Sequence, residues 1–198
     1  MNPLDTIKGT LIAGLVLAVV LALVIGGPVD SSHLVVMRWL HIAAGVAWIG
    51  LLYYFNFVQV PALAEAAADK GGPGGAGVTK YVAPRALLWF RWAAVATWLT
   101  GAGYLMQAGW LVGALSFGMA GAPGHNAIGA GAWLGTIMIF NVWVLIWPNQ
   151  QKVLGLKPAT DEEKAKARRT AFLASRTNTM LSLPMLLFMA ASAHGMPF

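Results

Sequence analysis

The sequence contains no cysteine, and this absence excludes several kinds of site at once. Disulfides, thiolate metal sites and iron–sulfur clusters need cysteine sulfur, and a c-type haem is attached covalently through a Cys-x-x-Cys-His motif. Any haem held by this chain is therefore expected to be non-covalent. Any redox role needs a bound cofactor or an external partner.

Charged residues are scarce as well, since they make up only 10% of the 198 residues, whereas 58% are apolar and the mean hydropathy is +0.67. A soluble domain carries about a quarter charged residues. The composition therefore predicts an all-α integral membrane protein with a single domain in the lipid bilayer. The net charge of +6 lies mostly in loops, where it indicates orientation and not a nucleic-acid partner.

Five apolar stretches are long enough to cross a bilayer, which takes about 20 helical residues. They predict a bundle of about five transmembrane helices, at residues 9–27, 34–60, 85–106, 126–147 and 171–193. The first stretch is too long for the apolar core of a signal peptide, and no Ala-x-Ala cleavage site follows it. We therefore expect a retained helix there.

Proline and glycine mark the expected boundaries of these spans. Pro61 and Pro148 are expected to end the second and fourth spans, and Pro184 to kink the fifth. Residues 70–79 are rich in glycine and predict a flexible loop. Residues 109–120 are apolar but too short to cross, which predicts an interfacial or re-entrant segment, or an extension of the third helix.

Lysine and arginine gather in alternate loops. Residues 62–85 and 149–170 carry them, whereas residues 26–37 and 107–125 contain none. By the positive-inside rule, the amino terminus and the basic loops lie in the cytoplasm and the carboxyl terminus lies in the periplasm. The sequence thus predicts a multi-pass protein of the bacterial inner (cytoplasmic) membrane.

All four histidines fall on the predicted outer side of the membrane. His33, His125 and His194 lie near helix ends, whereas His41 lies roughly 10 Å inside the second span. An imidazole in lipid needs a partner, and imidazoles from different helices are how helical bundles hold haem. We expect His41 to ligate a haem iron, with His125 or His194 as the second ligand. The alternative for those two, and the expectation for His33, is contact with water and headgroups.

The helix predicted around His41 carries further polar and small residues on the same face. At a helical period this stripe within residues 38–59 consists of His41, Gly45, Trp48, Leu52, Phe55 with Asn56, and Gln59. Ala44 and Gly45 lie one turn from the imidazole. Their small side chains predict a gap beside His41 that could admit a flat cofactor.

A second polar layer is expected on the cytoplasmic side of the bundle. Its members come from four helices and are Asn56, Gln59, Arg91, Asn141, Arg176 and Asn178. An arginine at membrane depth must face the interior and find acceptors. Arginines with carboxamides would suit a substrate, a haem propionate or a quinone carbonyl. The alternative is a structural hydrogen-bond lock between helices.

Four stretches in spans two to five carry a family resemblance. They are HIAAGVAWIGLLYYFNF, FRWAAVATWLTG, WLGTIMIFNVWVLIWPNQQKV and SRTNTMLSLPMLLFMAASAH. In this order they resemble the membrane domain of the bacterial membrane-bound urate oxidase (urate hydroxylase) family. The resemblance implies oxidation of urate to 5-hydroxyisourate, with electrons passing to a carboxyl-terminal cytochrome c domain.

The chain departs from the family pattern in three respects. It ends without any cysteine, so we expect a short form that lacks the cytochrome c domain, and it is shorter between the third and fourth spans. His41 and His194 match histidines of the pattern, whereas Gly129 and Thr177 stand where the pattern has two others. His125, one helical turn before Gly129, is a candidate substitute.

Two functional hypotheses are open. The first is a membrane-embedded redox protein of the urate hydroxylase type that binds haem b and passes electrons to a separate cytochrome c, a quinone or a larger membrane complex. The second is a non-catalytic accessory transmembrane subunit of a respiratory or photosynthetic complex. A transporter is less favoured, because the sequence shows no inverted repeat.

Overall fold

The structure is a computed structural model that describes residues 2–25, 33–117, 119 and 125–196. The chain divides into two compact units, Met1–Ser32 and His33–Phe198. Within the described residues every regular element is a helix. The predicted all-α class is therefore confirmed for this part of the chain.

The amino-terminal unit holds a short 3₁₀ turn, η1 (Pro3–Asp5), and one long helix, α1 (Ile7–Ile25). The side chain of Asn2 accepts a hydrogen bond from the backbone N–H of Leu4 and so caps the turn. No residue of α1 is buried within the unit. A helix that is apolar on every side is typical of a membrane span. The predicted end of this span at residues 26–27 lies outside the described residues.

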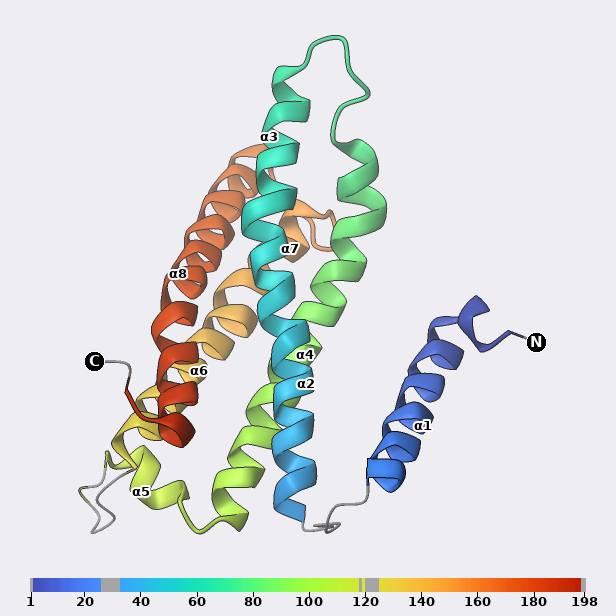
Figure 1. Cartoon of the computed structure of the whole chain (residues 1–198). Helices are drawn as coiled ribbons and strands as arrows, with labels where there is room; N and C mark the ends of the chain where they lie inside the picture. Colours follow the sequence, from blue (N-terminus) through green and yellow to red (C-terminus); the bar gives the residue numbers. More distant parts are fainter. Residues whose placement is uncertain (1, 26–32, 118, 120–124, 197–198) are drawn as a thin grey trace. The chain divides into compact units, whose positions relative to one another are not determined.

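The second unit contains four long helical stretches and one short helix, α5 (Leu111–Leu115). The first two stretches join α2 (His33–Tyr53), η2 (Tyr54–Gln59) and α3 (Val60–Ala68), and then η3 (Val78–Val82) and α4 (Ala83–Gln107). The other two join α6 (Asn126–Phe140), η4 (Asn141–Ile146) and α7 (Trp147–Val153), and then α8 (Asp161–His194). Figure 1 shows α2 beside α4 and α6 beside α8, each pair antiparallel.

Three of these segments, η2, η3 and η4, are π-helical, and each ends two residues before a proline. The prolines are Pro61, Pro84 and Pro148. A proline lacks the N–H of an α-helix and its ring crowds the carbonyl four residues earlier. A wider π turn relieves that crowding while the helix continues. Pro61 and Pro148 therefore do not end their helices as predicted: α3 continues to Ala68 and α7 to Val153.

The core of the second unit lies between the two helix pairs. Its largest fully buried apolar side chains are Leu52, Phe90, Met138 and Val142, one from each of α2, α4, α6 and η4. The rings of Phe55 and Phe90 meet edge to face with their centroids 5.5 Å apart. The same layer of side chains thus fixes the spacing of all the helices that carry polar site candidates.

The segment at 109–120 is confirmed as too short to span. It forms the five-residue helix α5, which packs on the start of α6 at one end of the unit (Figure 1). A Cβ on Gly129 would collide with the backbone oxygen of Ala114. Glycine is needed there because α5 approaches α6 backbone to backbone. Residues 118 and 120 of the segment lie outside the described residues.

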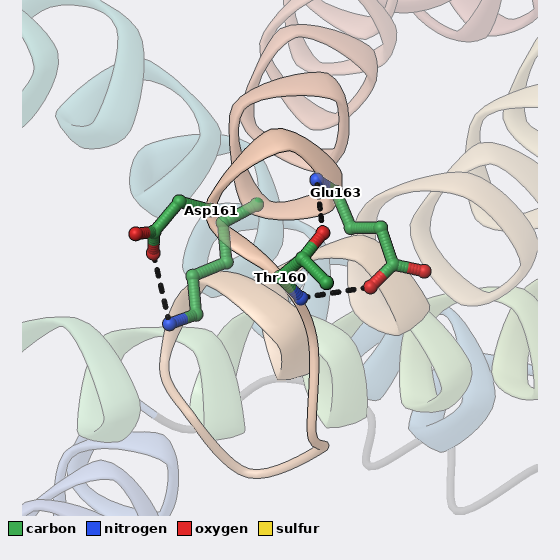
Figure 2. A network of polar contacts seen from close by, with 4 residues as sticks. Thr160, Asp161 and Glu163 are labelled. Atoms are coloured by element: carbon green, nitrogen blue, oxygen red, sulfur yellow. Dashed lines mark hydrogen bonds and ion pairs between the residues drawn. The ribbon is translucent and has the colours of Figure 1, made fainter.

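Helix α8 begins ten residues before the predicted fifth span, at Asp161. Thr160 caps it: its hydroxyl accepts from the N–H of Glu163 at 3.2 Å, and the Glu163 carboxylate accepts from the N–H of Thr160 at 2.8 Å (Figure 2). This reciprocal pair is a capping box. It starts the helix within the polar stretch, and α8 then continues through Pro184 as one helix.

Three helices are long and apolar enough to cross a membrane: Ile7–Ile25, His33–Ala68 and Asn126–Val153. The last two contain the predicted second and fourth spans, and Ile7–Ile25 covers the described part of the predicted first span. Arginines interrupt the apolar stretches of α4 and α8, at Arg91 and Arg176. The third and fifth spans stay predictions. The glycine-rich loop is shorter than expected, because η3 already begins at Val78.

Candidate functional site

Three histidines lie at the same end of the second unit. His33 is the first residue of α2, His125 precedes α6 as its N-cap residue, and His194 is the last residue of α8. Figure 1 shows these helix ends at the same end of the unit, where α5 packs on the start of α6. His33 and His194 are exposed, whereas His41, two turns into α2, is half-buried.

The imidazole of His41 is held by the neighbouring helix. Its Nδ1 lies 2.8 Å from the backbone oxygen of Thr97 on α4. A carbonyl can only accept, so this contact places the proton on Nδ1 and leaves the lone pair on Nε2. Histidines that ligate metals are commonly oriented by a hydrogen bond of this kind.

The predicted gap beside His41 is filled by α4. The methyl group of Thr97 lies 3.7 Å from where a Cβ on Gly45 would stand, and a Cβ on Gly101 would come within 2.8 Å of the His41 ring. The small residues therefore bring α2 and α4 together instead of opening a slot between them. Any cofactor on His41 must approach from the Nε2 side, away from Thr97.

His125 and His194 differ in their surroundings. The His125 ring stacks on Trp110 with centroids 5.1 Å apart and planes 30° apart. Its Nδ1 is buried and has no hydrogen-bond partner in the described part of the chain. His194, in the last turn of α8, is exposed. No group of three or more His, Cys, Asp or Glu among the described residues could hold a metal ion.

The second polar layer is centred on two asparagines. The Asn141 amide donates to Asn178 Oδ1 at 2.8 Å, and the Asn178 amide donates to the Met138 backbone oxygen at 2.9 Å. Asn178 is fully buried. Because both polar atoms of its side chain are already paired, Asn178 links α8 to α6 and η4 and has no free group for a ligand.

Asn56 and Gln59 lie on η2, the π segment that widens the second span. Asn56 donates to the backbone oxygen of Leu52 at 2.9 Å and to the hydroxyl of Ser175 on α8 at 2.8 Å. Gln59 is buried, and its Oε1 has no partner among the described residues. Asn56 thus ties η2 to α8, while Gln59 keeps an open acceptor.

The two arginines of this layer have different surroundings. The Arg91 guanidinium carbon lies 3.7 Å from the centre of the Trp147 ring on α7, a close cation–π contact. Arg176 is exposed and lies 5.3 Å from the Phe172 ring on its own helix. On α8 the side chain of Asn178 faces inward, so Arg176, two residues earlier, faces outward. The structure therefore places Asn141 beside Asn178, whereas Arg176 lies apart from both.

A surface groove of about 310 Å³ opens beside Asn141. Its other lining residues are Leu145, Thr170, Leu173, Ala174 and Thr177. This volume lies at the small end of the range for ligand pockets, about 300–1,000 Å³. Asn141 is the one predicted site residue that lines it.

Several polar partners were not identified from the sequence. They are Trp147 beneath Arg91, Ser175 beside Asn56, and Tyr53, whose hydroxyl lies 2.9 Å from that of Ser182. The indole N–H groups of Trp48 and Trp143 are buried with no partner in the described residues. Tryptophan is so frequent in this chain that its periodicity alone could not single out these positions.

Comparison with known proteins gives one match. The model of a family described as "Urate oxidase N-terminal" matches residues 29–122 and 120–198. No curated protein matches, and no solved structure matches. The two matched segments meet at residues 120–122, between α5 and α6 in the sequence.

Proposed function

We propose that this chain, which belongs to the urate oxidase N-terminal family, is a membrane-embedded redox domain of the urate hydroxylase type that binds haem b and hands electrons to a separate carrier. Family membership supports the urate hydroxylase type. The contact from His41 Nδ1 to the Thr97 oxygen, at 2.8 Å, carries the haem assignment, because it leaves Nε2 as the free nitrogen of a half-buried imidazole.

The nitrogen atoms of His41 and of one further histidine would hold the iron of a haem. His41 would supply one ligand through Nε2. His125 is the better candidate for the other, because its buried Nδ1 has no partner among the described residues, and His194 is the alternative. A haem bound there would supply one-electron chemistry. The chain's own part is to orient the His41 ring through the Thr97 carbonyl.

In the second polar layer, only some of the residues predicted to bind a substrate or a haem propionate are placed to do so. Asn141 lines the groove on η4 and α8, and Arg91 on α4 holds a positive charge against the Trp147 ring. Asn178 positions Asn141 and would not touch a ligand. We assign Asn141 and Arg91 to ligand binding, Asn56 and Asn178 to positioning, and Arg176 to the outer surface.

Electrons would leave through a second protein or a quinone. The sequence has no cysteine for a covalent haem, so a separate cytochrome c, a quinone or a larger membrane complex would accept them. The location that fits this role is the bacterial inner membrane, with five spans, the amino terminus in the cytoplasm and the carboxyl terminus in the periplasm.

An absorption spectrum of the purified chain tests the haem assignment. We expect a Soret band that His41→Ala abolishes, because the variant loses the Nε2 ligand. His33→Ala is the matched control on the same helix and should keep the band, since His33 is exposed. His125→Ala and His194→Ala identify the second ligand. A wild-type chain with no Soret band and no iron, or an unchanged band in His41→Ala, would contradict the assignment.

An accessory, non-catalytic subunit is the second candidate. It is favoured by the tight packing of His41 on Gly101, which leaves no slot between α2 and α4, and by α1, which buries none of its apolar residues within its own unit. Extraction in mild detergent followed by mass spectrometry separates the two candidates. A large partner in fixed stoichiometry, with no haem, would support the accessory role.

A further inference from the structure

A second surface groove, of about 470 Å³, lies between the end of α2 and the start of α4. Its polar lining consists of two tyrosines and one arginine, Tyr54, Tyr81 and Arg85. Its apolar lining includes Leu51, Val82 and Trp89. The groove is far from the histidine end of the unit, because α2 begins at His33 and α4 runs antiparallel to it (Figure 1).

The groove lies where the bundle leaves the hydrocarbon core. From Ala86 to Met106, α4 is apolar apart from Arg91, and this stretch is roughly 30 Å long, the thickness of the hydrocarbon core. Arg85 directly precedes it. Tyrosine and tryptophan are also the residues that gather at headgroup depth. The Arg85 guanidinium is therefore placed at the level of lipid phosphates.

The positive charge in the groove is not neutralised by the protein. Arg85 is exposed and forms no ion pair or hydrogen bond with the described residues, in which the one ion pair is between Lys164 and Asp161. A second cation adjoins it, because Lys80 Nζ lies 5.4 Å from the centre of the Tyr81 ring. The hydroxyls of Tyr54 and Tyr81 likewise have no partner among those residues. These groups are therefore donors free to bind a ligand that supplies oxygen atoms.

We propose that this groove binds the headgroup of an anionic phospholipid. Arg85 would donate to two phosphate oxygens, a geometry that its planar guanidinium favours. The tyrosine hydroxyls would donate to the remaining phosphate or glycerol oxygens. An acyl chain would lie along Leu51 and Trp89, on the hydrocarbon side of Arg85. The lining of the groove thus combines donors for a phosphate with apolar side chains for a tail.

Native mass spectrometry of the full chain in mild detergent tests the proposal. Phosphatidylglycerol, phosphatidylcholine with the same acyl chains, and inorganic phosphate are titrated separately. We expect adducts with phosphatidylglycerol, at least about fivefold weaker adducts with phosphatidylcholine, because one basic residue near a membrane surface is worth about 1 kcal/mol, and none with phosphate alone.

Variants assign the adduct to the groove. Arg85→Gln should weaken the phosphatidylglycerol adduct at least about fivefold, whereas Arg85→Lys, which keeps the charge but loses the paired donors, should weaken it less. Arg168→Gln removes an equally exposed arginine from α8 and should change nothing. Equal binding of the two lipids, an unchanged adduct in Arg85→Gln, or an equal loss in Arg168→Gln would overturn the proposal. Binding of inorganic phosphate as strong as that of the lipid would also overturn it, in favour of a soluble anion. The Soret band is expected to be the same in all of these variants.

Discussion

At the residue scale, the asparagines show how a polar side chain in a membrane helix divides between structure and function. Asn56, Asn141 and Asn178 were predicted together because they share a depth on three helices. Depth follows from counting residues along a span, so the sequence could supply it. The hydrogen-bond partner of each side chain could not be predicted by counting residues. It depends on which neighbouring helix presents an oxygen, and for Asn178 that oxygen is the backbone carbonyl of Met138 on α6.

Replacing Asn178 should cost stability more than it costs ligand binding. Asn178→Ala leaves the buried Asn141 amide without its acceptor and removes one of the donors to the buried Met138 backbone oxygen. An unpaired buried polar group costs about 1–3 kcal/mol, so the thermal unfolding midpoint in detergent should fall clearly. Thr177→Ala, at the adjacent exposed position, is the control. Equal midpoints for the two variants would argue against the hydrogen-bond lock.

The histidines illustrate a second limit at this scale. The end of the unit at which three of them lie could be predicted, because His33, His125 and His194 lie near predicted helix ends. Whether a given imidazole is buried, exposed or stacked on another ring could not be predicted from the sequence. The Trp110 ring that covers His125 comes from the turn before α5, and no spacing along the chain relates these two residues.

At the element scale, proline had a different effect from the one predicted. Local chemistry indicates a helix end near Pro61 and Pro148, because proline lacks the backbone donor. The structure instead inserts a π segment before each proline and continues the helix. Extra helix length is favoured in lipid, where a broken helix would leave unpaired backbone groups. The amide side chains Asn56 and Asn141 lie in these widened turns, which are frequent at functional sites.

The stability of the first turn of α8 is expected to depend on pH, because its capping box contains the carboxylate of Glu163. The backbone N–H of Thr160 donates to the Glu163 carboxylate, and this bond, with the positive charge of Lys152, lowers the pKa of Glu163 below its ordinary value. A lowered folded pKa means that the stabilisation is present above the unfolded pKa, about 4.3. It is lost as the pH falls through the folded pKa.

Hydrogen exchange of the first turn of α8 can measure this effect. We expect protection of residues 160–164 to fall when the pH, with exchange rates corrected for it, drops below the ordinary glutamate pKa. Glu163→Gln can still accept the bond but does not titrate, so its protection should vary less over the same pH range. Thr160→Ala should lower protection at every pH, because the helix loses its N-cap at a cost of about 1 kcal/mol. A pH response in Glu163→Gln as large as that of the wild type would contradict the prediction.

At the scale of the whole molecule, the predicted topology can be tested because the chain contains no cysteine. A single introduced cysteine is then the only thiol that a maleimide can label. Leu156 and Met196 are suitable, with exposed fractions of 60% and 49%. In intact spheroplasts a membrane-impermeant maleimide should label Met196→Cys, and it should label Leu156→Cys only after permeabilisation. Labelling of both from the same side would contradict a membrane-spanning α8.

The sequence alone determined the helical class, three of the apolar spans and the family. The class and these spans depend on composition or on short-range periodicity, which a linear chain displays directly, whereas the family depends on the resemblance of four stretches of sequence. The four matched stretches lie in order along the second to fifth spans, and the family match over residues 29–198 agrees with them. The first residue of α8 was missed, because Thr160 and Glu163 form a capping box inside a stretch that looks polar throughout.

Only the tertiary structure decided which side chains are free to act. Gly45 and Gly101 could have opened a slot beside His41, but they allow α4 to pack against it. Arg176 shares its depth with Asn178 yet faces outward, whereas Arg91 lies on Trp147. The physical reason is that burial and pairing depend on neighbours distant in sequence. Residue type and depth come from the chain itself, whereas the availability of a nitrogen or an oxygen comes from what the next helix places against it.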